Sequence, residues 1–202
     1  MSKYIDKIFY INLNKRTDRR VLIENELVNY NLPFERFEAI ETSGFGIYGC
    51  GLSHLGVLKI AREREYKNVL ILEDDFTFLV SKEDFETNLT KFFESGINYD
   101  VCKLAYNLVE KQAIDNEILG KVIFSTSASA YIVNNSYYDK LINLYEWAMP
   151  LLSSTKAHWI YANDQVWKDY QKNDNWFYFK TRIGKQRPSY SDNSLNFADY
   201  GV

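Results

Sequence analysis

Apolar residues along the chain recur with two alternating periods, and this pattern predicts strands and helices in turn. Short runs rich in β-branched and aromatic residues predict strands. These runs are residues 7–13, 34–40, 68–75, 99–106, 121–124, 128–133 and 176–180. Apolar positions three or four residues apart predict helices. The helical segments are residues 18–29 and 52–65, a segment after Ser81, residues 136–149, and a segment that begins near Asn163.

Local signals set the expected ends of these elements. Thr17 and Asp18 are expected to cap the first helix, and Ser81 a later one. Pro150 is expected to end the helix 136–149, and residues 44–51 are expected to form a glycine-rich loop. The expected inner face of the first helix consists of Val21, Leu22, Leu27 and Val28.

Strands that alternate with helices indicate an α/β fold with a mixed, mostly parallel sheet flanked by helices. A length of 202 residues suits one domain, residues 1–202. The polar tail, residues 181–202, is expected to lie over the active site and outside the core. Residues 110–121 are the expected surface excursion.

Composition removes several classes of function. Hydrophobic residues make up 46% and aromatic residues 16%, which excludes a disordered chain. The net charge is −3, and basic residues are dispersed apart from Arg16, Arg19 and Arg20, so we expect no nucleic acid partner. Neither a secretory leader nor a transmembrane segment is evident. Cys50 and Cys102 lack metal-ligand spacing and read as buried, reduced thiols. We therefore expect a cytoplasmic location, either in the cytosol or at the periphery of a membrane.

Three consecutive carboxylates, Glu73, Asp74 and Asp75, end the apolar run of residues 68–75. Such a run is typical of a strand buried on both faces, and open α/β sheets bind ligands beyond the carboxyl ends of their strands. Adjacent acids repel one another, and a divalent cation would hold them together. The alternative is a solvated acidic turn.

The glycines at positions 44, 46 and 49 match the spacing of a dinucleotide-binding motif. The segment before them, residues 36–41, carries charges where a central strand should be apolar. An NAD(P)-dependent Rossmann oxidoreductase therefore stays an alternative. The glycines can equally serve a tight loop.

Seven motifs follow one another along the chain: Phe9-Tyr-Ile-Asn-Leu13, Arg16-Thr-Asp-Arg-Arg20, Gly49-Cys-Gly-Leu-Ser-His54, Leu70-Ile-Leu-Glu-Asp-Asp75, residues 126–133, Asp164-Gln165 and residues 186–192. In this order they resemble glycosyltransferase family 25, which includes lipopolysaccharide-biosynthesis glycosyltransferases and collagen β-galactosyltransferases. The resemblance covers nearly the whole chain. The chain departs from the family in a shortened connection between Glu41 and Gly49 and in Val57-Leu58, where many members carry an aromatic residue.

This resemblance implies a GT-A fold, a UDP-sugar donor, and an inverting, Mn²⁺- or Mg²⁺-assisted transfer of a hexose, galactose or glucose, to an acceptor hydroxyl. The acceptor would be a glycan, a lipid-linked or lipooligosaccharide glycan, or a protein. By similarity, Asp75 would bind the metal, Asp74 the ribose, and Glu73 the sugar hydroxyls. A fold that keeps the nucleotide-sugar site but has lost transfer is a further alternative.

Other donor contacts are expected around the first strand and the glycine-rich loop. Asn12 and the backbone near Leu13 would line the uracil and ribose pocket. Arg16 and Arg19 would approach the base or the phosphates, or simply begin a solvated helix. The last two expected donor contacts are Ser53 and His54, placed where helix N–H groups would face an anion.

The proton of the acceptor hydroxyl needs a base, and Asp164 is the candidate. The alternative is an ordinary acid at the start of a helix. His158 and Asp169 are further candidates for the base. In the tail, Ser191 and Asp192 are expected to close over the diphosphate or complete the metal site.

Overall fold

A six-stranded sheet forms the centre of the computed structural model, which describes residues 3–191, 196–199 and 201. Its strands lie in the order β2-β1-β3-β6-β5-β7. Neighbours are parallel except where β6 pairs with β3, β5 and β7, so β6 alone runs against the other strands of this sheet. The strands are β1 (Lys7–Asn12), β2 (Phe34–Glu38), β3 (Asn68–Glu73), β5 (Val101–Gln112), β6 (Leu119–Asn134) and β7 (Trp176–Phe179). The predicted α/β class with a mixed, mostly parallel sheet is confirmed.

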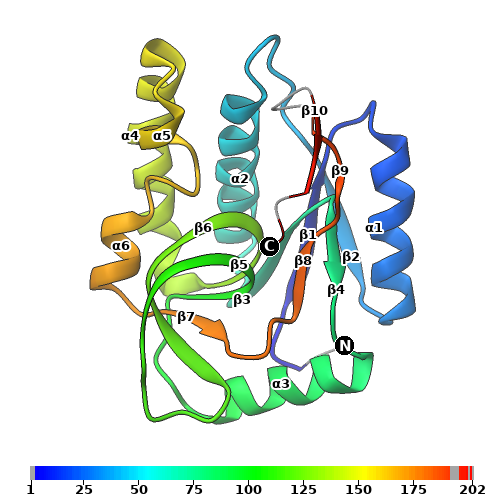
Figure 1. Cartoon of the computed structure of the whole chain (residues 1–202), viewed down its shortest axis with the longest axis vertical. Coiled ribbons are helices and arrows are strands. Elements are labelled where there is room, and N and C mark those ends of the chain that lie inside the picture. The colour runs from blue at the N-terminus through cyan, green and yellow to red at the C-terminus, as the bar shows by residue number, and fades with distance from the viewer. Residues whose placement is uncertain (1–2, 192–195, 200, 202) are drawn as a thin grey trace.

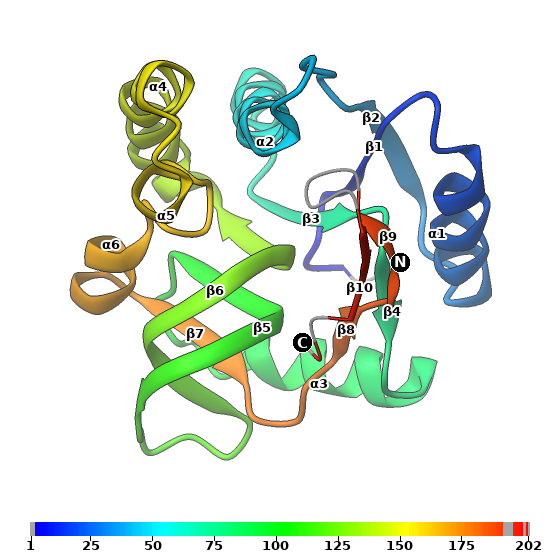
Figure 2. The ribbon, with the colours of Figure 1, turned by 45° about the horizontal axis from the view of Figure 1, so that its top comes forward.

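Helices cover both faces of this sheet (Figures 1 and 2). α2 and α4 pack on one face, while α1 and α3 pack on the other. The helices are α1 (Thr17–Asn29), α2 (Gly46–Glu63), α3 (Lys82–Glu94), α4 (Tyr138–Thr155), α5 (His158–Tyr161) and α6 (Lys168–Asn173), with a 3₁₀ turn at Asn135–Tyr137. Two small sheets pair β4 (Phe76–Phe78) with β8 (Gly184–Gln186) and β9 (Ser189–Ser191) with β10 (Asn196–Ala198).

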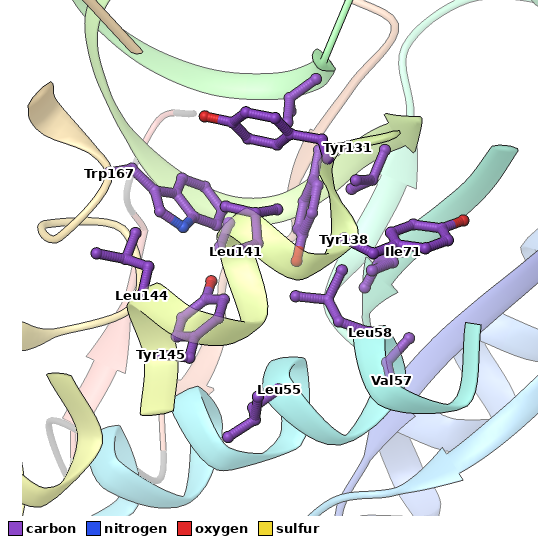
Figure 3. Packing of buried hydrophobic residues seen from close by; sticks show 14 of the residues in the cluster. Leu55, Val57, Leu58, Ile71, Tyr131, Tyr138, Leu141, Leu144, Tyr145 and Trp167 are labelled. Atoms are coloured by element: carbon purple, nitrogen blue, oxygen red, sulfur yellow. The ribbon is translucent and has the colours of Figure 1, made fainter. Parts of the chain in front are cut away.

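Each central strand sends alternate side chains to the two faces, because successive residues of a strand point in opposite directions. Val69 and Ile71 of β3 join the core under α2 and α4 (Figure 3). Leu70 and Leu72 join the core under α1 and α3. All four are fully buried. This explains why the strand reads as an unbroken apolar run.

The first helix buries only one of its four predicted inner residues, Leu27, together with Ile23. Ile23 and Leu27, one turn apart, face the core. Val21, Leu22 and Val28 are 57%, 44% and 60% exposed, so three of the four predicted inner residues are wrong. The reason is that one contact stripe at four-residue spacing is enough to seat this short, polar helix.

The helix caps agree only in part with the signals in the sequence. Ser81 caps α3 and accepts a hydrogen bond from the backbone N–H of Asp84, as predicted. Arg16 occupies the cap position of α1 without a side-chain cap bond, so the predicted caps Thr17 and Asp18 lie inside the helix. Asp18 pairs with the guanidinium of Arg16 instead.

Two helices extend beyond their predicted ends. α2 begins at Gly46, so most of the expected loop 44–51 is helical. A Cβ at Gly49 would lie 2.3 Å from the carbonyl oxygen of Ile40, so a close backbone approach requires this glycine. α4 continues through Pro150 to Thr155, because the buried Leu152 packs the last turn and offsets the one missing helix bond.

The second half differs most from the prediction. β6 is one long strand where two were expected, and Ser127 inside it has a φ of 69°. β5 and β6 form a hairpin through most of the expected excursion 110–121. The helix expected near Asn163 starts at Lys168, after turns. Ile183 is fully buried and β8 pairs with β4, so the first part of the tail belongs to the core.

Candidate functional site

The carboxyl end of β3 distributes its acids to opposite sides of the sheet. Ile71 faces α2, so Glu73, two residues on, faces α2 as well. Leu72 faces α1, and Asp74 follows it to that side. Asp75 lies beyond the end of the strand. The strand period therefore gives the first two acids separate hydrogen-bond partners, although the charge of Glu73 still acts on Asp74 and Asp75.

On the α2 side, Glu73 belongs to a buried polar group of side chains. Its Oε1 lies 3.1 Å from Nε2 of His54 and 3.6 Å from Sγ of Cys50. Nδ1 of His54 lies 2.7 Å from the hydroxyl of Tyr131 on β6. Burial raises the pKa of Glu73, but the hydrogen bonds from His54 and Cys50 outweigh burial and lower it overall. Glu73 is therefore ionised and engaged by helix α2.

On the α1 side, both oxygens of Asp74 have protein donors. Asn12 of β1 donates to Oδ2 at 2.7 Å, and Nη1 of Arg19 donates to Oδ1 at 2.9 Å. The amide of Asn12 also donates to the carbonyl of Arg16 and accepts from Arg36. Burial raises the pKa of Asp74, and Arg19 and Asn12 counteract it. Asn12, Arg19 and Asp74, all expected at the donor site, therefore lie together.

Asp75 has the least complete set of partners among these acids. Nη1 of Arg19 lies 3.3 Å from its Oδ2. Its Oδ1 is buried and accepts no hydrogen bond of ordinary geometry from the described residues, although the side chain of Gln186 on β8 lies close enough to lower the pKa of Asp75. Burial, and next the negative charge of Glu73, raises the pKa of Asp75 to about 7. A buried carboxylate oxygen without a donor, next to two other acids, suits a divalent cation.

Part of the tail lies against the same arginine. Nη2 of Arg19 donates to Oγ of Ser189 at 2.6 Å and to the carbonyl of Tyr190 at 3.0 Å. The backbone N–H of Arg187 donates to the carbonyl of Asp75 at 2.6 Å. Ser191 ends β9, while Asp192 lies outside the described residues. The tail strand β9 therefore borders the acids that end β3.

Ser53 and His54, two of the expected donor contacts, do not lie at the start of a helix as the sequence predicted. Because α2 begins at Gly46, Ser53 and His54 lie well inside the helix, and their N–H groups do not face an anion. The hydroxyl of Ser53 accepts from the N–H of Ile40 and donates to the carbonyl of Gly49. Leu13 follows β1, half-buried, and its carbonyl accepts from the N–H of Arg16.

Asp164 was predicted at the start of a helix, but it lies in the turns before α6. Its Oδ2 accepts from the backbone N–H of Ser127 at 2.9 Å, and its Oδ1 accepts from Gln165 at 3.2 Å. The charges of Glu73, Asp164 and Asp75 all act on the thiol of Cys50, whose pKa is raised by burial first and by these acids next. Asp164 therefore lies near enough to Cys50 for its charge to act on the same thiol as Glu73 and Asp75. His158 and Asp169, the other candidate bases, are exposed on α5 and α6.

A buried lysine that sequence reasoning missed holds this part of β6. Nζ of Lys103 donates to Oγ of Ser125 at 2.9 Å and to the carbonyls of Thr126 and Ser127 at 2.9 and 2.6 Å. Burial lowers the pKa of Lys103 to about 7, against the attraction of Asp164 and Glu73. The signal was present in the sequence, because a lysine in the middle of the apolar strand 101–106 needs buried partners.

A groove between α4, α5 and α6 is lined in part by Gln165, the residue that follows Asp164. Trp147 and Trp159, which are 57% and 62% exposed, lie on two of its walls. Lys168 and Asp169 add charged groups to its lining. Exposed tryptophans that line a groove with polar groups are typical of ligand-binding surfaces.

The comparisons with known proteins find relatives that are named as glycosyltransferases. No protein-family model matches the chain. The chain is similar in sequence to curated glycosyltransferases. One relative, R655 of Acanthamoeba polyphaga mimivirus, is named as a glycosyltransferase and is 34% identical over 111 residues, which cover 44% of this chain and 33% of that protein. Procollagen galactosyltransferase 2 of Homo sapiens is 27% identical over 131 residues, which cover 52% of this chain and 20% of that protein. The chain thus matches about a third and a fifth of the length of these relatives.

Among solved structures, A197 from STIV is similar to this chain with a TM-score of 0.50 at 13% identity, over 85% of this chain and 80% of that chain. At this identity the likeness concerns the fold alone. A search of the described helices finds none with both the length and the apolar character needed to span a bilayer.

Proposed function

We propose that this chain is a metal-dependent, inverting glycosyltransferase of family 25 with a GT-A fold, which transfers a hexose, galactose or glucose, from a UDP-sugar to an acceptor hydroxyl. The observation that carries the proposal is the buried acid pair Asp74 and Asp75 beyond the carboxyl end of β3, with Oδ1 of Asp75 lacking a donor. Similarity to curated glycosyltransferases over about half of the chain supports the reaction class.

Asp75 is the proposed ligand of Mn²⁺ or Mg²⁺. Its unpartnered carboxylate oxygen and its acidic surroundings fit a cation that prefers oxygen ligands. The bound cation would supply positive charge to the diphosphate leaving group. Arg19 adds a second positive charge at the same place, since its guanidinium bonds Asp74 and Asp75.

Asp74 and Asn12 are proposed to line the ribose side of the donor pocket. Both oxygens of Asp74 already accept hydrogen bonds, so a ribose hydroxyl would bind there as an additional donor or replace one of these bonds. Arg16 and Leu13 border the same pocket at the end of β1. Glu73 and His54 hold each other on the α2 side, and we assign them to the sugar side of the donor.

Asp164 is the proposed general base. The backbone N–H of Ser127 donates to Oδ2 and Gln165 donates to Oδ1, so the carboxylate is oriented while the residue stays half-buried. The groove that Gln165 helps to line is the proposed path of the acceptor, with Trp147 and Trp159 offering flat apolar faces to a sugar ring. The acceptor class, whether glycan, lipooligosaccharide or protein, stays open.

The experiment is a panel of UDP-sugars tested for binding and for slow hydrolysis, with and without Mn²⁺. We expect metal-dependent cleavage of one UDP-hexose and its loss in Asp75→Ala. Asp115→Ala, which changes an exposed acid in the β5–β6 connection, is the matched control and should behave as the parent protein. Metal-independent binding, or full cleavage by folded Asp75→Ala, would contradict the proposal.

A second variant tests the base separately from the donor site. Asp164→Asn keeps the shape of the side chain and removes its ability to accept a proton. We expect transfer to fall at least about 100-fold while UDP-sugar affinity stays unchanged. Near-normal transfer by this variant would exclude Asp164 as the base.

A further inference from the structure

A group of three different metal-ligating side chains lies on the α2 side of the sheet, apart from the carboxylate oxygens of Asp75. Cys50 and His54 are four residues apart on α2 and therefore share one face of that helix. Glu73 reaches them from the end of β3. The ligand atoms of the three residues all lie within 4.8 Å of one another. Sequence reasoning set Cys50 aside as an isolated thiol, yet the Cys-x₃-His spacing on a helix was the available signal.

We propose that Cys50, His54 and Glu73 bind a zinc-class divalent ion, Zn²⁺ or Co²⁺. One thiolate, one imidazole and one carboxylate form a donor set that these ions prefer over Mn²⁺ or Mg²⁺. Three protein ligands leave the fourth tetrahedral position to water or to a substrate oxygen.

The spacing of the ligand atoms fits a tetrahedral ion. With Zn–N, Zn–O and Zn–S bonds of ordinary length, tetrahedral angles place N and O about 3.3 Å apart and S and O about 3.5 Å apart. The corresponding distances here are 3.1 Å between His54 Nε2 and Glu73 Oε1, and 3.6 Å between Cys50 Sγ and Glu73 Oε1. These two pairs therefore match a tetrahedral site, and all three ligand atoms lie within 4.8 Å of one another.

The surroundings supply what such a site needs beyond its ligands. The hydroxyl of Tyr131, 2.7 Å from Nδ1 of His54, orients the imidazole, as the outer partners of metal-bound histidines do. Asp75 and Asp164 add negative charge around Cys50, which attracts a cation. An ion that binds thiolate and carboxylate also neutralises two negative charges in a buried place.

Metal entry changes the protonation of Cys50 and His54. The S–H bond of Cys50 breaks, its proton leaves to solvent, and the sulfur binds the ion. His54 changes tautomer: the proton with which Nε2 bonds Glu73 leaves to solvent, and Nδ1 takes one proton from solvent and donates it to the hydroxyl oxygen of Tyr131. No redox change takes place, because Zn²⁺ has no redox chemistry.

The test is a titration of metal-free protein with Co²⁺, followed by absorption. A thiolate–cobalt charge-transfer band in the near ultraviolet, saturating at one equivalent and removed by Zn²⁺, is the expected result. Cys50→Ala should lose the band. Cys102→Ala is the matched control, because Cys102 is the other cysteine and is buried in the core under α1 and α3. This control should keep the band.

Two more variants separate this site from the proposed Mn²⁺ site. Asp75→Ala should keep the cobalt band, whatever happens to sugar transfer. Tyr131→Phe removes only the hydroxyl that orients His54, and we expect Zn²⁺ affinity to fall about 10- to 100-fold. Absence of the band in the parent protein, or its survival in folded Cys50→Ala, would show that the three side chains form only a hydrogen-bonded cluster.

Discussion

Lys103 allows the sharpest test of how this site is built. It is fully buried, and burial lowers its pKa from 10.5 to about 7. In the unfolded chain the amine keeps its proton up to a pH near 10.5, while in the folded protein it releases the proton near pH 7. The unfolded state therefore binds more protons between these two values, so the free energy of unfolding rises with pH across this window.

The size of the effect follows from the two pKa values. Their difference corresponds to at most about 5 kcal/mol over the whole window, and to about 3 kcal/mol between pH 7 and pH 9.5. Lys103→Met keeps the length of the side chain but removes the titrating group. The stability of the parent protein relative to this variant should therefore grow by about 3 kcal/mol from pH 7 to pH 9.5.

Urea unfolding at several pH values, followed by circular dichroism, measures this difference. The two proteins share every other titrating group, so the comparison isolates Lys103. Lys172→Met, which changes an exposed lysine on α6, is the control, and its difference from the parent should not vary with pH. A constant difference for Lys103→Met would show that Asp164 and Glu73 keep Lys103 charged throughout.

Four further variants test the fold and the site. Leu58→Ala empties a fully buried position under α4 and should lower the free energy of unfolding by about 3 kcal/mol, measured with urea. Ser81→Ala removes the cap of α3 and should cost about 1 kcal/mol; no change would mean that the cap bond contributes nothing. Arg19→Met leaves Asp74 buried without its cation and should lower the free energy of unfolding by about 3 kcal/mol at pH 8. The loss should be smaller at pH 5, because protonation of Asp74 and Asp75 removes the unpaired charge. Trp159→Ala should leave urea stability and UDP-sugar binding unchanged while raising the KM for acceptor, and an unchanged KM would remove the groove from the acceptor path.

The sheet could be predicted from sequence because its strands are buried on both faces. The runs that became β1, β3 and β7 are apolar apart from the end residues of β1 and β3, and no helix of their length would compete. α1 was harder to predict. Its sequence has a weak apolar stripe, so only the packing against the sheet selects Ile23 and Leu27 over their apolar neighbours.

The location of the site could be predicted from the sequence, but the arrangement of its side chains could not. The acids that end β3 were visible in the sequence, yet their partners come from elements far apart in the chain. His54 and Arg19 reach Glu73 and Asp74 from opposite sides of the sheet, which only the strand period reveals. The long strand β6 was missed because Ser127 interrupts the apolar pattern where its positive φ bends the backbone.

The antiparallel strand β6 fixes one part of the site, whereas a turn between short helices carries another part that tolerates sequence change. Tyr131 stands opposite Ile71 in the β3–β6 ladder, so the sheet register holds its hydroxyl on the side of Glu73, and a slip of one residue would move it to the other face. Asp164, by contrast, rests on a turn between short helices, where insertions disturb no ladder. Under the proposed function, sequence change in residues 156–167 would alter which acceptor is used while the donor side keeps its geometry, so acceptor choice would be the more evolvable property of this fold.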